Sequence, residues 1–216
     1  MDILTIASQK GGAGKTTLSA HLAVEAVRRG AGPVAVVDTD PQGSLSDWWN
    51  QRAAETPDFA SVEIGRLAAQ MSTLAQQRIN LVVIDTPPAF LDTIRAAIAV
   101  ATLVLIPARP SPHDLRAVGV VVEMAEQAHK PFCFVVNGAT PRSLIALEAM
   151  QALAQHGPVA PVIIHQRIDF AASMVDGRTA GEVNPRSRSA EEMANLWTYV
   201  DTQLHQPRRS SEDGHT

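Results

Sequence analysis

The chain has 216 residues, of which 45% are hydrophobic, and this is enough apolar material for one globular domain with a substantial core. A net charge of −4 excludes a protein that coats nucleic acid through its overall charge, so such binding would need a local basic patch. No apolar run reaches the roughly 18 residues of a membrane span, and the acidic start of the chain does not resemble a signal peptide. The single cysteine, Cys133, excludes an internal disulfide and fits a cytoplasmic protein; we expect it in the core.

Six short apolar runs bounded by turn residues predict buried β-strands. In chain order they are ILTIAS (3–8), PVAVVD (33–38), LVVIDT (81–86), TLVLIP (102–107), PFCFVVN (131–137) and PVIIH (161–165). Between them, residues 15–30, 113–130 and 143–157 carry apolar side chains at helical spacing. This alternation predicts an α/β fold, a mostly parallel twisted sheet with helices on both faces. Ligands of such a sheet bind at the carboxyl ends of the strands.

We expect a single domain over residues 1–204. The polar segment 51–58, which contains Pro57, predicts a loop within that domain. The last residues, 205–216, read HQPRRSSEDGHT and are low in apolar side chains, which is typical of a disordered tail.

The first strand is followed by QKGGAGKTT (9–17) and then by a helix, the context of a phosphate-binding loop. Its glycines let successive backbone N–H groups converge on phosphate oxygens, and the helix N-terminus adds partial positive charge. Lys15 would reach the β- and γ-phosphates, Thr16 would ligate Mg²⁺ and Thr17 would lie at the α-phosphate. The predicted loop contacts are Gly11, Gly12, Ala13, Gly14, Lys15, Thr16 and Thr17. A simple glycine-rich turn is the alternative.

The standard pattern G-x-x-x-x-G-K-[ST] is not met, because Gln9 stands where the first glycine should be. The spelling K-G-G-x-G-K-T-T instead resembles the deviant Walker A motif of the ParA/MinD superfamily of ATPases, especially its small ParA-type members. The resemblance implies a P-loop NTPase that binds ATP with Mg²⁺, in which Lys10 reaches the nucleotide of the opposite subunit. A second positive charge would stabilise the transferring phosphoryl group, so hydrolysis would depend on dimerisation. A solvated loop lysine is the alternative for Lys10.

Acidic residues end the second and third strands. Asp38 and Asp40 are two residues apart in an extended segment, which points both carboxylates the same way. The family's D-x-D-P-Q motif implies that Asp40 polarises the attacking water and Asp38 supports the Mg²⁺ shell. The alternative is that this acidic motif caps the helix starting near Ser44, and Asp40 could cap it and still be catalytic. Asp85 ends a strand in the Walker B pattern and would hold Mg²⁺ directly or through water. Thr86 would begin a turn that senses the γ-phosphate.

The resemblance extends from about residue 3 to residue 204. It includes a segment with Pro107, Pro110, Ser111, Asp114 and Leu115, which we expect to be interfacial, although its Ser/Asp pair could simply cap the next helix. At the end of the fifth predicted strand, Asn137 occupies the position of an amide that pairs with adenine in the family. Trp48 and Trp49 follow the acidic motif, and we expect them to be buried on a helix.

For function, the resemblance implies slow, partner-dependent ATP hydrolysis by an ATP-sandwich homodimer. This dimer would bind DNA non-specifically, be nucleoid-associated, and be released when a small DNA-binding or adaptor protein stimulates hydrolysis, so that plasmid DNA, a chromosome or a protein cargo is moved. A shared basic surface could include Arg142, Arg167, Arg178, Arg186 and Arg188, although scattered surface arginines are as good an interpretation.

Two other functions remain open at this point. One is a metabolic or assembly enzyme on the same scaffold, whose substrate pocket the sequence does not identify. The other is a MinD-like membrane-cycling ATPase, which would need an amphipathic C-terminal helix; the polar residues 205–216 supply no apolar face. We therefore expect no membrane partner.

Overall fold

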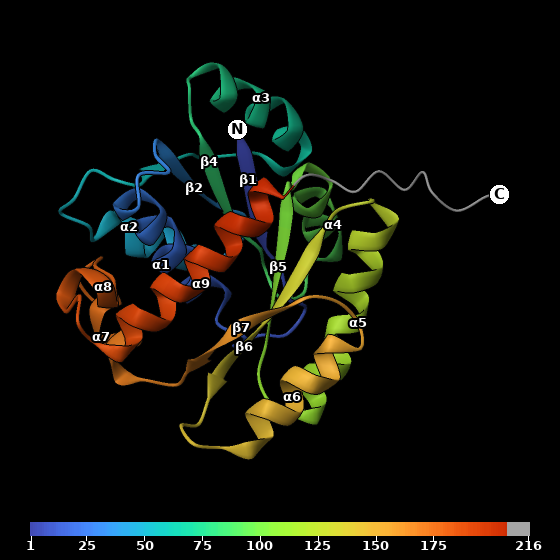
Figure 1. Ribbon diagram of the computed structural model, residues 1–216. Helices are drawn as coiled ribbons and strands as arrows, with labels where there is room; N and C mark the ends of the chain where they lie inside the picture. The colour runs from blue at the N-terminus through green and yellow to red at the C-terminus, as the bar shows by residue number, and fades with distance from the viewer. Residues whose placement is uncertain (207–216) are drawn as a thin grey trace.

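The structure is a computed structural model that describes residues 1–206 (Figure 1). The last helix, α9, ends at His205, so the first residue of the predicted tail belongs to that helix. Residues 207–216 of the predicted tail lie outside the described residues.

Seven parallel strands form one sheet in the order β3-β2-β4-β1-β5-β6-β7. The six predicted strands are all present, and the predicted fold class is confirmed. The seventh strand, β3, begins at Asp58, the last residue of the segment predicted as a loop. The strands are β1 (Asp2–Ile6), β2 (Val34–Asp38), β3 (Asp58–Phe59), β4 (Leu81–Asp85), β5 (Leu103–Ala108), β6 (Phe132–Ala139) and β7 (Val159–His165).

Helices connect the strands and cover both faces of the sheet (Figure 1). They are α1 (Lys15–Arg28), α2 (Ser44–Asn50), the 3₁₀ turn Ile64–Arg66, α3 (Leu67–Gln76), α4 (Leu91–Val100), α5 (Pro112–Gln127), α6 (Leu144–Ala154), α7 (Ile168–Met174), α8 (Ala180–Val183) and α9 (Arg188–His205). The three predicted helices correspond to α1, α5 and α6, and a helix does start at Ser44.

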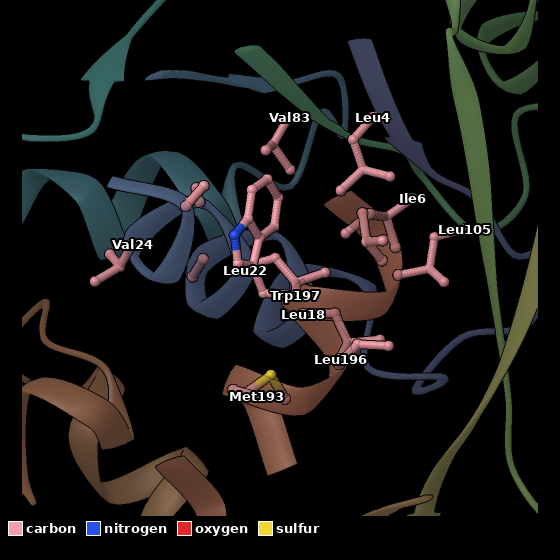
Figure 2. Packing of buried hydrophobic residues seen from close by; sticks show 14 of the residues in the cluster. Leu4, Ile6, Leu18, Leu22, Val24, Val83, Leu105, Met193, Leu196 and Trp197 are labelled. Carbon is pink, nitrogen blue, oxygen red and sulfur yellow. The ribbon is translucent and has the colours of Figure 1, made fainter. Parts of the chain in front are cut away.

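The core divides into layers on the two faces, because side chains alternate along each strand. Leu4 and Ile6 of β1 point to the face covered by α1 and α9, where Trp197 of α9 packs among them (Figure 2). Ile3 points to the opposite face, against α3 and α4. Cys133 is fully buried, as predicted, and burial raises the pKa of its thiol to about 12.

The parallel arrangement brings the predicted site residues to one edge of the sheet. In the register of the central strands, Ile6 at the end of β1 pairs with Asp85 of β4, and Asp85 pairs with Asp38 of β2. The loop that follows β1 therefore starts beside Asp85 and one strand away from Asp38. Asn137, near the end of β6, lies at the same edge.

Candidate functional site

The loop between β1 and α1 has the backbone that a phosphate-binding loop requires. Gly14 stands at the N-terminus of α1 with φ 87°, a left-handed conformation that favours glycine. A Cβ at this position would also collide with the side chain of Asn137. Asn137 in turn donates a hydrogen bond from Nδ2 to the carbonyl of Ala13, at 2.7 Å. Through this bond to Ala13, Asn137 of β6 helps to fix the shape of the loop.

Lys15 is buried at 7% exposure, and its ammonium donates to the carbonyl oxygen of Lys10 at 3.3 Å. Burial lowers the pKa of Lys15, while the carboxylates of Asp85 and Asp40 oppose that shift. A cation in this position gains from a nearby anion, since the ionised form is disfavoured by desolvation alone. The environment of Lys15 therefore suits a bound phosphate.

Thr16 and Asp85 form the centre of the site. The Thr16 hydroxyl donates to Asp85 Oδ2 at 2.6 Å, and Asp85 is only 1% exposed. Burial raises the pKa of Asp85 to about 7; the neighbouring Asp38 adds to this shift, whereas Thr16 and Lys15 oppose it. Among the described residues, no side chain or backbone group bonds Asp85 Oδ1, although it is buried.

This donor set fits Mg²⁺, which prefers oxygen ligands and keeps several of its waters. A buried carboxylate oxygen without a partner is costly, and a divalent cation would satisfy it and stabilise the ionised form of Asp85. Thr16 and Asp85 are the residues that would hold the ion, directly or through water.

Asp38 and Asp40 make different contacts, and the support that Asp38 would give to the Mg²⁺ shell stays a prediction. Asp38 Oδ2 accepts hydrogen bonds from the amides of Leu45 and Ser46, at 3.0 and 2.9 Å, and from the Ser46 hydroxyl, at 3.0 Å. Asp38, and not Asp40, therefore caps α2. Asp38 Oδ1 also accepts from the Asp40 amide at 3.0 Å, so the capping residue fixes the backbone of the next acid. The carboxylate of Asp40 accepts only from the amide of Gln42, at 3.0 Å, among the described groups.

Lys10 lies at the surface of the loop, unlike Lys15. Its side chain is 44% exposed, and its Nζ lies 3.9 Å from Asp114 Oδ2. Asp114 is held at the start of α5 by Ser111, whose hydroxyl oxygen accepts from the Asp114 amide at 3.2 Å. The Ser/Asp pair of the predicted interfacial segment does cap a helix, and it also brings an acid to Lys10.

The other predicted residues lie around this centre. The Thr86 hydroxyl donates to the carbonyl of Ile6 at 2.9 Å, so it joins the end of β4 to β1. Thr17 is half-buried, and its carbonyl contacts His21. Arg109, which sequence reasoning missed, follows β5 and extends past Gly138, with its guanidinium 3.9 Å from the place of a Cβ on Gly12. An arginine directly after a strand at the ligand edge is the signal that could have found it.

The five arginines proposed for a basic surface are not equivalent. Arg167 contacts Glu192 at 2.6 Å, and Arg178 contacts Asp176 at 2.6 Å, so acids neutralise both. Arg142, Arg186 and Arg188 are exposed and have no ion pair among the described residues.

Taken together, the parallel sheet, the glycine-containing loop at the start of α1 and the buried Thr16–Asp85 pair define a phosphate-loop nucleotide-binding protein. Comparison with known proteins then gives the family. Residues 4–180 match the CobQ/CobB/MinD/ParA nucleotide binding domain. The chain belongs to this family, and the ParA/MinD resemblance of the sequence is confirmed.

Two sequence relatives and one solved structure of similar fold illustrate what the chain resembles. Maintenance of carboxysome distribution protein A of Halothiobacillus neapolitanus is 31% identical over 201 residues, which cover 89% of this chain and 92% of the relative. The chromosome-partitioning ATPase Soj of Thermus thermophilus is 26% identical over 231 residues, covering 89% of this chain and 92% of Soj. The structure of the septum site-determining protein MinD with Mg-ADP from Pyrococcus horikoshii has a TM-score of 0.79 at 19% identity, over 94% of this chain and 97% of that one.

Across the described part of the chain, we find no helix with the length and apolar character needed to span a bilayer.

Proposed function

We propose that this protein is a ParA-type positioning ATPase, which binds ATP and Mg²⁺, dimerises around two nucleotides and hydrolyses them slowly. The observation that carries the proposal is the contrast between its two loop lysines. Lys15 is buried beside Thr16 and Asp85, where it would bind the phosphates of its own nucleotide. Lys10 is exposed on the rim of the same loop, from which it can act on a second copy of the chain.

Hydrolysis would proceed by in-line attack of water on the γ-phosphorus. The new bond forms to the water oxygen, the bond to the β–γ bridging oxygen breaks, and ADP and inorganic phosphate leave. Asp40 would orient the water and take up its proton, while Lys10 of the opposite subunit would stabilise the charge on the transferring group. When bound, Mg²⁺ would neutralise charge on the β- and γ-phosphate oxygens.

The proposed task is to position a cargo, which is either DNA or a protein assembly, along non-specifically bound DNA. The names of the relatives support both cargoes, since one distributes carboxysomes and the other partitions chromosomes. Arg142, Arg186 and Arg188 would provide the phosphate contacts, because they are exposed and lack an acidic partner in the described region. A small DNA-binding or adaptor protein would stimulate hydrolysis and release the dimer.

The proposal is tested by DNA binding of the Asp40→Ala protein, which should bind ATP and dimerise but not turn over. Affinity for a non-specific duplex is measured with ATP and with ADP at several salt concentrations. We expect binding with ATP only, weakening steeply with salt, and weaker binding after Arg142, Arg186 and Arg188 are all changed to Gln. An ATP-dependent dimer that does not bind DNA would contradict the proposal and favour an enzyme or a protein-only switch.

A further inference from the structure

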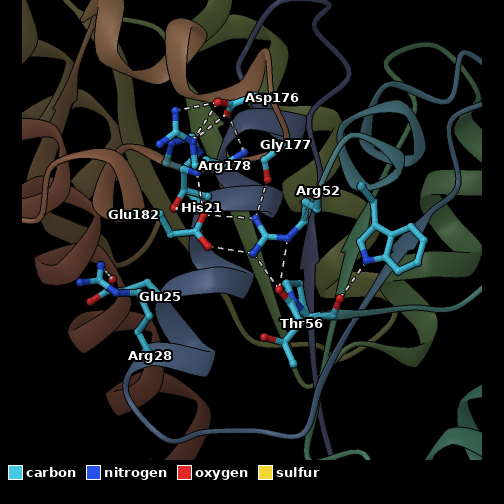
Figure 3. Close-up of polar contacts among 12 residues, drawn as sticks. His21, Glu25, Arg28, Arg52, Thr56, Asp176, Gly177, Arg178 and Glu182 are labelled. Carbon is cyan, nitrogen blue, oxygen red and sulfur yellow. Dashed lines mark hydrogen bonds and ion pairs between the residues drawn. The ribbon is translucent and has the colours of Figure 1, made fainter. Parts of the chain in front are cut away.

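A buried arginine side chain joins the C-terminal end of α2 to a segment that is distant in the sequence. Arg52 lies two residues after α2, and its side chain is 3% exposed. Its guanidinium donates to both carboxylate oxygens of Glu182, at 2.8 and 3.1 Å, to the carbonyl of Thr56 at 2.7 Å, and to the carbonyl of Gly177 (Figure 3). The bidentate contact with Glu182 fixes the Arg52 guanidinium in both position and orientation.

Helix α2, which precedes Arg52, contacts the same part of the chain as Arg52 does. The indole N–H of Trp48 donates to the carbonyl of Arg178 at 3.1 Å, and the Arg52 guanidinium lies 4.9 Å from the centre of the Trp48 ring. Gly177 has φ 73° and packs so closely that a Cβ would collide with the backbone of Gln51 and Arg52. The C-terminal end of α2 therefore rests on residues 177–182, which we call the bridge segment.

The bridge segment is also fastened to the phosphate-loop helix. The amide of Ala180 donates to Nε2 of His21 at 3.1 Å, and His21 Nδ1 donates to the carbonyl of Thr17 at 2.8 Å. Burial lowers the pKa of His21 to about 4, so the ring is neutral and Nε2 can accept. The bridge segment thus contacts α1 at His21, which in turn bonds the carbonyl of Thr17 in the first turn, and it also contacts the far end of α2.

Asp38 and Asp40 lie next to the N-terminal end of α2. Asp38 ends β2, and its bonds to Leu45 and Ser46 join the start of α2 to the sheet; it also accepts from the amide of Asp40. The amide of Gly43, just before α2, donates to the carbonyl of Asp40 at 2.9 Å, so Asp40 is bonded to the start of α2 as well.

α2 has only seven residues, and a helix of this length takes its orientation from the contacts around it rather than from its own stability. At the far end, this orientation is set by the contacts of Trp48 and Arg52 with the bridge segment and by Trp49, whose indole N–H donates to the carbonyl of Pro57 at 2.8 Å.

We infer that Arg52 is a positioning residue for hydrolysis, which holds α2 against the bridge segment and thereby sets the place of Asp40 relative to the phosphate loop. The inference rests on the proposed function. Because an error of about 1 Å in a reacting group costs roughly a hundredfold in rate, loss of Arg52 lowers turnover. Nucleotide affinity changes little, because Lys15 and Thr16 lie on α1 and are not bonded to Arg52.

The test compares Arg52→Gln, Arg52→Lys and Glu182→Gln with Arg29→Gln, a matched control that breaks an arginine–glutamate pair at 2.9 Å away from α2. For each protein the dissociation constant of ATP and kcat at saturating ATP are measured, together with hydrogen exchange in a peptide over residues 43–50. We expect kcat to fall at least about tenfold in Arg52→Gln, less in Arg52→Lys, with the affinity for ATP within about twofold. Exchange over residues 43–50 should accelerate in the same variants and not in the control.

The double variant Arg52→Gln/Glu182→Gln should lose less turnover than the two single losses combined, because both changes weaken the same Arg52–Glu182 contact. The inference is overturned if kcat of the Arg52 variants stays within about twofold of the unaltered chain, or if ATP affinity falls as much as turnover. If Arg52→Gln does not fold, Arg52→Lys and Glu182→Gln decide by the same criteria. Failure of the proposed function would look different, since the unaltered chain itself would not hydrolyse ATP.

Discussion

The two lysines of the phosphate loop are five residues apart and lie in opposite environments. Lys15 is buried beside Thr16 and Asp85 of its own chain. Lys10 is nearly half exposed, and the acid nearest to it is 3.9 Å away. Under the proposed function, this difference separates two tasks: Lys15 serves ATP binding within one chain, whereas Lys10 serves hydrolysis in a second copy.

The largest effect is expected where the buried lysine is removed. Lys15→Ala should lower ATP affinity by about a hundredfold or more and abolish turnover, because a charge-assisted contact to the phosphates is lost from a desolvated site. Isothermal titration and a phosphate-release assay measure the two quantities. Lys130→Ala is the matched control, since Lys130 precedes β6 at the opposite edge of the sheet. Normal ATP binding by Lys15→Ala would contradict the role of Lys15 in binding the phosphates of ATP.

The exposed lysine should behave differently. Lys10→Ala is expected to bind ATP within about threefold of the unaltered chain, yet to turn over at least about a hundredfold more slowly, the usual cost of losing one transition-state charge contact. The same two assays test this. Equal losses of affinity and turnover would mean that Lys10 serves its own nucleotide, and the contrast with Lys15 would fail.

A smaller effect, on stability rather than turnover, is expected from the buried His21 of α1. Burial lowers the pKa of His21 from 6.5 to about 4, with Glu182 as the nearby charge that opposes the shift. Because the fold favours the neutral ring, its contribution is complete above pH 6.5 and is lost as the pH falls toward 4. When the pH is well below 4, the free energy of unfolding should be lower by about 3 kcal/mol than it is above pH 6.5.

Urea unfolding at several pH values measures this contribution. His21→Gln can donate to Thr17 without titrating, so its stability should fall less between pH 6.5 and pH 4 than that of the unaltered chain. Identical pH dependence in the two proteins would show that His21 is not held neutral by the fold.

The sequence was sufficient for the parts that depend on local pattern. Continuous apolar runs predicted six of the seven strands, and parallel pairing then required the strand-end residues Asp38 and Asp85 to meet at one edge. The two-residue strand β3 was missed because it has no apolar run of its own and depends on pairing with β2. Short edge pairing of this kind leaves almost no local signal.

Side-chain partners were harder to predict than strands. In the segment Asp38–Asp40 either carboxylate could have capped α2, and only the path of the chain after Pro41 decides that Asp38 does so. The contact of Arg52 with Glu182 joins residues 130 positions apart, so no spacing rule could find it. Asn137 was predicted to contact adenine, and its bond to Ala13 shows a second task that depends on how closely β6 approaches the loop. The adenine contact stays a prediction.

The central claim, that hydrolysis is shared between two copies of the chain, is tested most directly by mixing two inactive variants. Lys10→Ala keeps its own Asp40, and Asp40→Ala keeps the Lys10 that it can offer to a partner. In a mixed dimer one of the two sites is complete. Equal mixing should therefore restore roughly a quarter of normal turnover per chain, since about half of the dimers are mixed. No turnover above that of the separate variants, with mixed dimers present, would contradict the claim and place Lys10 at its own nucleotide.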